Sequence, residues 1–231
     1  MVGAYLVGDA SASTAVVLCA DAPGWRAPGV RQFAELLNKE SGALVVVPDL
    51  ARGDTWYGDA DPAARARDAN FADWQKGHPP SRVARDIAAI GAALRERGAK
   101  RVCVVGVGTG AVPVAELLGR TEKEKSEEPT MDAGVLACAI GLGASAASDA
   151  AASGIPTLFV WGGGDTAAAC AQSVVTKVET RKTQNKWKSV VAVGASEFFV
   201  FANEKAEGGD GDRRAETAKA VSAWFGMTND R

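Results

Sequence analysis

Arg101–Leu118 has the sequence RVCVVGVGTGAVPVAELL. It starts with a hydrophobic run, passes through three glycines at alternate positions and continues as a helical pattern. Glycine adopts positive φ and lets two backbone segments approach closely, so Gly106, Gly108 and Gly110 predict a sharp turn from a strand into a helix. A strand that leads directly into a helix is the building unit of parallel α/β sheets.

Short runs of Val, Leu and Ile recur on both sides of this turn and alternate with alanine-rich helical patterns. The runs are continuously hydrophobic, which is typical of strands covered on both faces. We therefore predict an α/β fold with a doubly wound, mainly parallel sheet and helices on both faces. The predicted strands are Ala15–Ala20, Ala43–Pro48, Arg101–Val107, Gly134–Ile140, Thr157–Trp161 and Ser189–Val193, and the predicted helices cover about Gly29–Glu40, Arg82–Gly98, Ala111–Leu118, Ala167–Thr180 and Arg213–Phe225.

The composition is that of a single globular domain spanning residues 1–231. The chain is 47% hydrophobic and has a formal net charge of −2. The near-neutral charge argues against a nucleic-acid partner, and the absence of a run of about 20 apolar residues argues against a membrane span. No signal peptide is evident, so we expect a cytoplasmic protein. The charged stretches Arg120–Pro129 and Glu204–Arg214 are predicted to be surface loops.

The four cysteines, Cys19, Cys103, Cys138 and Cys170, are far apart in the sequence, and the chain has a single histidine, His78. Zinc sites need closely spaced Cys and His pairs, so we expect no metal and no cofactor. Cysteines in or beside hydrophobic runs are predicted to be buried small side chains in a reducing compartment. His78 precedes two prolines and is predicted to be a surface or loop residue. It could reach a site only if its loop folded over the glycine turn.

Two known structural motifs share the geometry of the glycine turn. In a dinucleotide-binding G-x-G-x-x-A turn, Gly106, Gly108 and Ala111 would hold a pyrophosphate at the helix N-terminus. In that motif the acidic residue that binds the ribose ends a strand about 20 residues after the turn. The acidic residues at that distance here, Glu127 and Glu128, lie in a charged loop. In a nucleophile elbow, G-x-nucleophile-x-G, the nucleophile position would be Gly108. Glycine has no side chain that could attack a substrate, so the residues alone indicate only an elbow-like turn.

Further segments follow the same order as in a known family. In Ala15–Asp54 an acidic residue, Asp21, comes after the first long strand, and VPDL at 47–50 precedes Gly53 and Asp54. After the glycine turn come IPTLFVWGGGD at 155–165 and VGASEFF at 193–199. These segments resemble the dienelactone hydrolase family, in which the last two carry the aspartate and the histidine of the catalytic triad. The resemblance covers about nine-tenths of the chain and implies an α/β-hydrolase-like fold.

The resemblance also implies that two of the three triad members are missing. The nucleophile position, usually Cys in that family, is Gly108, the acid position is Asp165, and the histidine position is Glu197. Covalent acyl transfer needs a nucleophilic side chain with a base in reach, so we expect no intact catalytic site. Thr109, whose backbone amide would serve the oxyanion hole, and Ser196, one residue before the base position, do not replace the nucleophile.

Three functional hypotheses remain open. The first is a pseudoenzyme of the family that serves as a structural or protein-interaction subunit of a larger assembly. The second is a residual ester or glycoside hydrolase in which Asp165 and Glu197 act as paired carboxylates, with Asp21 near the same cleft. The third is a small-ligand-binding protein that uses room left above Gly108, where backbone amides could hold a carboxylate or a phosphate.

Aromatic residues are the candidate anchors for a protein partner. Trp56, Tyr57 and Trp74 lie in the long segment 51–80, and Trp187 lies in a basic stretch. Aromatic and arginine side chains are enriched at interface centres. The bias toward Ala and Gly is typical of a GC-rich genome, such as that of an alga or an actinobacterium, and the family resemblance favours the alga. Large algal assemblies such as ciliary axonemes recruit enzyme-like folds, so by analogy a cytoskeletal or ciliary location is one expectation for a structural subunit.

Overall fold

The computed structural model describes residues 3–58, 62–65, 67–120, 131–138, 142–162, 171–172, 175–176, 187–192, 200 and 210–228. Strands and helices alternate along most of this part of the chain, as predicted. The strands are β1 (Ala4–Val7), β2 (Thr14–Cys19), β3 (Leu44–Pro48), β4 (Arg101–Val107), β5 (Ala133–Ala137), β6 (Thr157–Gly162) and β7 (Trp187–Ala192). The helices are α1 (Pro28–Ser41), α2 (Pro62–Arg65), α3 (Ala69–Gly77), α4 (Pro80–Glu96), α5 (Ala111–Gly119), α6 (Ala144–Ala152) and α8 (Asp210–Met227), with 3-10 turns at Gly24–Arg26 and Gly108–Gly110.

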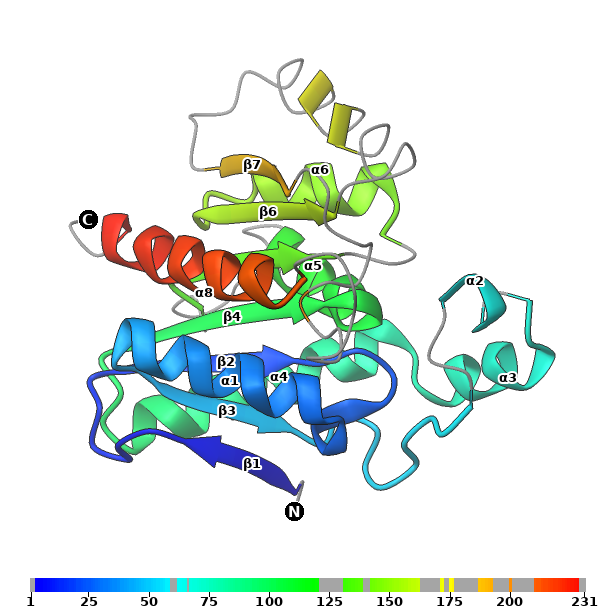
Figure 1. The fold of residues 1–231 in the computed structure, drawn as a ribbon, viewed down its shortest axis with the longest axis horizontal. Helices are drawn as coiled ribbons and strands as arrows, with labels where there is room; N and C mark the ends of the chain where they lie inside the picture. The colour runs from blue at the N-terminus through cyan, green and yellow to red at the C-terminus, as the bar shows by residue number, and fades with distance from the viewer. Residues whose placement is uncertain are drawn as a thin grey trace.

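The strands form one seven-stranded sheet in the order β1-β3-β2-β4-β5-β6-β7 (Figure 1). All neighbouring strands are parallel except β1, which pairs antiparallel with β3 at the edge. The predicted fold class, a mainly parallel doubly wound α/β sheet, is confirmed. β1 was not predicted, because its hydrophobic run AYLV is only four residues long and is only half covered.

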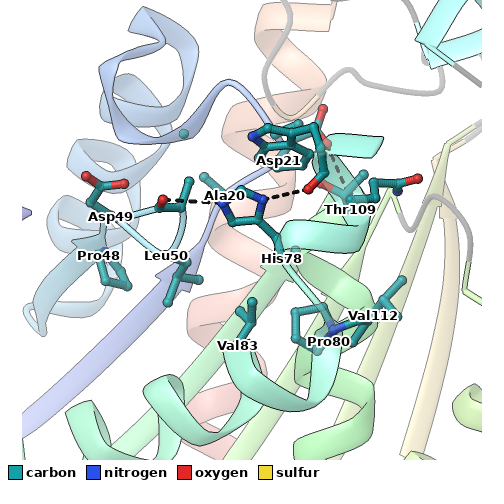
Figure 2. A pocket seen from close by; sticks show the side chains of 17 residues that line it. Ala20, Asp21, Pro48, Asp49, Leu50, His78, Pro80, Val83, Thr109 and Val112 are labelled. Carbon is teal, nitrogen blue, oxygen red and sulfur yellow. Dashed lines mark hydrogen bonds between the residues drawn. The ribbon is translucent and has the colours of Figure 1, made fainter. Parts of the chain in front are cut away.

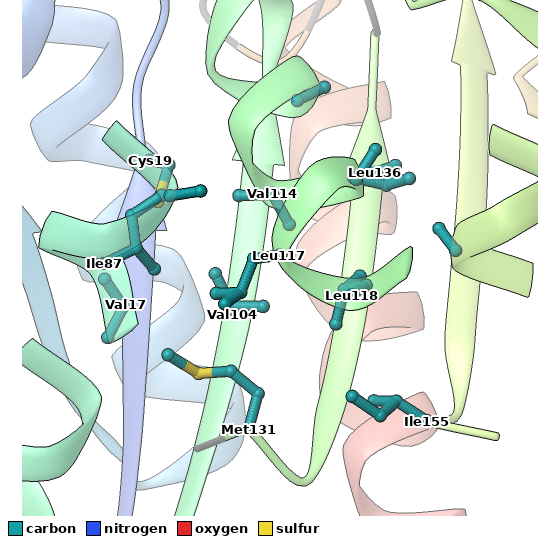
Figure 3. Packing of buried hydrophobic residues seen from close by; sticks show 14 of the residues in the cluster. Val17, Cys19, Ile87, Val104, Val114, Leu117, Leu118, Met131, Leu136 and Ile155 are labelled. Atoms are coloured by element: carbon teal, nitrogen blue, oxygen red, sulfur yellow. The ribbon is translucent and has the colours of Figure 1, made fainter. Parts of the chain in front are cut away.

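Helices cover both faces of the sheet. On one face α1 and α8 pack together, and α1 buries Val30, Phe33, Ala34 and Leu37 at the spacing of one helical stripe. On the other face, α4, α5 and α6 cover a second core (Figure 3), in which α5 packs through Val114 and residues near it onto β4. The core therefore lies in two layers that hold the central strands β2 and β4 rigidly between them.

The segment between β3 and α4 differs most from the prediction, because it holds two helices that the pattern did not indicate. α3 begins after Asp68, whose side chain accepts a hydrogen bond from Asn70 N at 2.8 Å. It buries only Phe71 and therefore lacks a helical stripe of hydrophobic residues. α2 and α3 lie beyond the carboxyl ends of the central strands (Figure 1).

Other differences concern the second half of the chain. α6 was not predicted, because its sequence ASAASDAAA has little hydrophobic contrast between its faces. The predicted strand Gly134–Ile140 ends earlier, at Ala137, where Cys138 adopts a φ of 48°. Most of the predicted helix Ala167–Thr180 lies outside the described residues, although 171–172 and 175–176 are helical. None of the helices in the described ranges has the length and apolar character needed to cross a bilayer.

Candidate functional site

The glycine turn connects β4 to α5 through one 3-10 turn, as the sequence predicted. Gly108 has a φ of 59°, in the left-handed region that side chains disfavour. Gly106 and Gly110 are needed for a different reason. A methyl group on Gly106 would lie 2.7 Å from Ala111 Cα, and one on Gly110 would overlap the carbonyl oxygen of Cys19. The turn is therefore held tightly between its own helix and the end of β2.

Asp21 fills the space in which a side chain at position 108 would stand. A methyl group built on Gly108 would lie 2.7 Å from Asp21 Cγ and 2.8 Å from its Oδ1. Asp21 was expected near the cleft, and the structure places it directly against the turn. The expected room above Gly108 is absent, since the carboxyl group of Asp21 occupies it.

The carboxylate of Asp21 is held from two sides. Its Oδ1 accepts hydrogen bonds from the backbone N of Thr109 at 3.0 Å and from Thr109 Oγ1 at 2.8 Å. Its Oδ2 accepts a hydrogen bond from Arg65 Nη2 at 2.6 Å. The backbone amide after position 108, which an elbow offers to an oxyanion, therefore already binds a carboxylate of the same chain.

Arg65 is the member of this cluster that the sequence did not indicate. The side chain of Arg65 is 1% exposed, and its guanidinium lies 5.4 Å from the centre of the Phe71 ring. The side chain of Asp21 is 11% exposed. Arg65 Nε and Nη1 are buried and have no hydrogen-bond partner among the described residues. Arg65 and Asp21 are 44 positions apart in the chain. Only the unpredicted helix α2 brings them together, so no local pattern could have revealed the pair.

A cavity of about 230 Å³ lies beside the turn, where β2, β3 and β4 end and α3, α4 and α5 begin or end (Figure 2). Its wall includes Asp21 and Thr109 on the side of the turn and His78 from the end of α3. Leu50, Val83 and Val112 form apolar parts of the wall. Ligands of open α/β sheets bind outside the carboxyl ends of the strands, and this cavity has that position.

His78 was expected to be a surface or loop residue, and it lies in the short loop between α3 and α4 but not at the surface. The side chain is only 10% exposed and lines the cavity, because segment 51–80 folds over the carboxyl ends of the strands. Nδ1 lies 2.7 Å from the carbonyl oxygen of Trp74, and Nε2 lies 3.3 Å from that of Ala51. The ring also stacks on Trp74, with centroids 4.4 Å apart. Both nitrogens face backbone carbonyls, so His78 is not placed as a base for Thr109.

Three of the four candidate aromatic anchors are half-buried and one is exposed. Trp56 and Trp74 pack with Phe71, with ring centroids 5.1 Å apart for Trp56 and Phe71 and 5.6 Å for Phe71 and Trp74. Trp187 packs against the core from β7. Tyr57 alone among the four is largely exposed, at 76%, and its hydroxyl accepts a hydrogen bond from Arg26 Nη1 at 3.2 Å.

Cys19, Cys103 and Cys138 are buried, as predicted from the hydrophobic runs around them, while Cys170 lies outside the described residues. Burial raises the pKa of the Cys103 thiol to about 12 and raises the pKa of Cys19 far above its ordinary value. These two thiols are therefore protonated and unreactive at neutral pH. Within the described ranges no three His, Cys, Asp or Glu side chains are grouped closely enough to hold a metal ion.

Comparison with solved structures identifies the fold. A dienelactone hydrolase from Anabaena variabilis superposes with a TM-score of 0.67 at 19% sequence identity, covering 98% of this chain and 91% of that one. Carboxyl esterase 2 of Tuber melanosporum superposes with a TM-score of 0.64 at 14% identity, covering 96% of this chain and 81% of that one. The chain has the α/β-hydrolase fold. No family model matches the sequence.

A curated relative is similar over part of the sequence. A Zea mays protein named endo-1,3;1,4-beta-D-glucanase is 38% identical over 123 residues, which are 53% of this chain and 37% of the maize protein. The match therefore spans well under half of that relative's length.

In this α/β-hydrolase fold the structure brings together three of the six candidate site residues, Asp21, Gly108 and Thr109. The other three, Asp165, Ser196 and Glu197, lie outside the described residues. The clear geometric result concerns the turn after β4, where Asp21 occupies the space in which a side chain on residue 108 would stand.

Proposed function

We propose that this chain is a member of the dienelactone hydrolase family that does not carry out covalent hydrolysis at its elbow. One observation carries the proposal. Gly108 keeps the positive φ of 59° that an elbow uses to present a nucleophile, yet it has no side chain, and Asp21 lies where that side chain would be. The fold is that of a hydrolase, whereas the reacting group is replaced by a carboxylate.

The groups around the elbow support the proposal. The hydroxyl of Thr109 donates to Asp21, and His78 is bonded to carbonyls of segment 51–80, so the described residues contain no nucleophile with an imidazole base beside it. The amide of Thr109 would have to release Asp21 before it could stabilise a tetrahedral oxyanion. Both requirements of acyl transfer are therefore unmet at this turn.

The test is a hydrolysis panel of activated esters, short-chain esters and lactones. The wild-type protein is expected to give rates equal to those of buffer. Thr109→Val and Ser196→Ala serve as matched variants, because they remove the two remaining hydroxyl groups and should change nothing. Turnover above the buffer rate that disappears in either variant would overturn the proposal.

A second candidate function is a hydrolase of glycosidic bonds. The name of the maize relative, a β-D-glucanase, favours it, and Asp165 and Glu197 are the carboxylates that would act as acid and base. Assay of mixed-linkage 1,3;1,4-β-glucan tests it, with release of reducing sugar as the readout. If this function is correct, Glu197→Gln lowers the rate at least about a hundredfold. No release by the wild-type protein would exclude it for this substrate.

A protein without covalent chemistry can be retained as a subunit of an assembly, and we propose such a structural or interaction role for this chain. Tyr57, exposed and bonded to Arg26, is the aromatic anchor that the fold leaves uncovered. Gradient fractionation of a native cell extract tests this role. Migration with a large complex that Tyr57→Ala disperses supports it, and migration of the wild-type protein near the monomer mass of 23.8 kDa argues against it. Fractionation of isolated cilia would test the ciliary location.

A further inference from the structure

We propose that the cavity beside the elbow binds a small, uncharged, ring-shaped apolar molecule. The site does not depend on catalysis and goes beyond the proposed function. The cavity has a volume of about 230 Å³, and a protein cavity of about 150 Å³ is large enough for benzene. A ligand with one or two fused rings therefore fits.

The wall of the cavity is largely apolar. Leu50 from the loop after β3, Val83 from α4 and Val112 from α5 contribute aliphatic surface, and Pro48, Pro80 and Pro113 add ring surface. Trp74 provides an aromatic surface whose plane is fixed by its stacking on Phe71 and His78. Apolar walls with one fixed aromatic group suit a flat hydrophobic ligand.

Three polar side chains of the wall, those of Asp21, Thr109 and His78, are already bonded to the protein. Asp21 accepts hydrogen bonds from Thr109 and Arg65, and the Thr109 hydroxyl donates its proton to Asp21. Both ring nitrogens of His78 face backbone carbonyls. A ligand with several hydroxyl groups would lose its hydrogen bonds to water and find few free partners here, which disfavours sugars.

The ion pair at the elbow offers no partner to a charged ligand. The carboxylate of Asp21 is neutralised by Arg65 at 2.6 Å, so this pair offers no free charge to an anion or a cation. A ligand carboxylate would also meet Asp21 at the elbow amide, where the anion position is taken. Asp49 is half-buried among the lining residues, and it is the group that could recruit an amine instead. A cationic ligand is therefore the competing outcome that the experiment must separate.

The experiment compares three ligands of matched shape by calorimetry: benzyl alcohol, benzoate and benzylamine, with glucose as a polar control. Benzyl alcohol is expected to bind at least about tenfold more tightly than either ion, because an ion loses its hydration and the Asp21–Arg65 pair offers it no partner. No heat is expected with glucose. Tighter binding of benzoate or benzylamine, binding of glucose, or no binding of benzyl alcohol would each overturn the proposal.

Two variants place the binding site. Val112→Phe fills the cavity and is expected to abolish binding of benzyl alcohol, whereas Val7→Phe, a matched change at a half-buried position of β1 that does not line the cavity, should leave binding unchanged. Unchanged binding in Val112→Phe would contradict the site. If Val112→Phe does not fold, the three-ligand series on the wild-type protein still decides the chemical class. These experiments measure binding and not turnover. A failure to bind benzyl alcohol therefore leaves the proposal about covalent hydrolysis unchanged, and detection of hydrolysis leaves the proposed ligand unchanged.

Discussion

The elbow and the cavity next to it lie side by side at the carboxyl ends of the same strands, yet they are built in opposite ways. At the elbow the space is filled by Asp21, which is bonded to Thr109 and Arg65. In the cavity about 230 Å³ is left open behind mostly apolar walls. A sharp strand-to-helix turn can therefore be closed by a buried ion pair while the pocket next to it stays open.

Removal of the buried cation should have the largest effect on the elbow. Arg65→Met leaves Asp21 without its counter-charge, and we expect a loss of about 3 kcal/mol in the free energy of unfolding, measured with urea. Arg52→Met is the matched control, because Arg52 forms an exposed ion pair with Asp86 at 2.7 Å and should cost less than about 1 kcal/mol. Equal losses would show that the Asp21–Arg65 pair is not a structural part of the elbow.

Substitution of the central glycine separates backbone strain from the presence of Asp21. Gly108→Ala combines a φ of 59° with contact against Asp21 and should cost about 2–4 kcal/mol in unfolding free energy. Gly42→Ala has a similar φ of 66° but nothing within 4 Å of the new methyl group, so about 1 kcal/mol is expected. If the two variants lose the same stability, Asp21 does not fill the elbow.

A smaller effect concerns Cys103, which lies in β4, the strand that leads to the elbow. Burial raises the pKa of its thiol from 9.0 to about 12, so the folded protein keeps a proton that the unfolded chain releases above about pH 9. Stability contributed in this way is complete below pH 9 and falls as the pH rises toward 12, by at most about 1.4 kcal/mol per pH unit. Urea unfolding at pH 8 and pH 10 should show a shallower decline for Cys103→Ala than for the wild-type protein. An identical decline would contradict burial of this thiol.

The sequence predicted those parts of the structure that depend on local patterns. The hydrophobic runs located the strands from β2 to β7, and the glycines at 106, 108 and 110 located the turn. The position of Asp21 near the cleft followed from the resemblance. α3 carries no such pattern, since it buries a single side chain and is held by contacts such as the hydrogen bond from Trp74 Nε1 to the carbonyl oxygen of Asp54.

The missed parts of the site depend on contacts between distant segments. Arg65 reaches Asp21 only because α2 folds over the end of β2, and His78 enters the cavity wall only because its ring nitrogens bind carbonyls of Trp74 and Ala51. A glycine at position 108 indicated lost chemistry, but it could not reveal that another residue fills the space. Whether a distant side chain occupies that space depends on tertiary packing, which only the three-dimensional structure shows.

The most direct test of the closed elbow is intact-protein mass spectrometry after incubation with an activated ester, 4-nitrophenyl acetate. A covalent hydrolase accumulates or passes through an acyl adduct on its elbow residue. For the wild-type protein we expect no adduct on residues 106–110 and release of nitrophenol at the buffer rate. An acetyl group found on Thr109, absent in Thr109→Val and accompanied by turnover, would contradict this expectation.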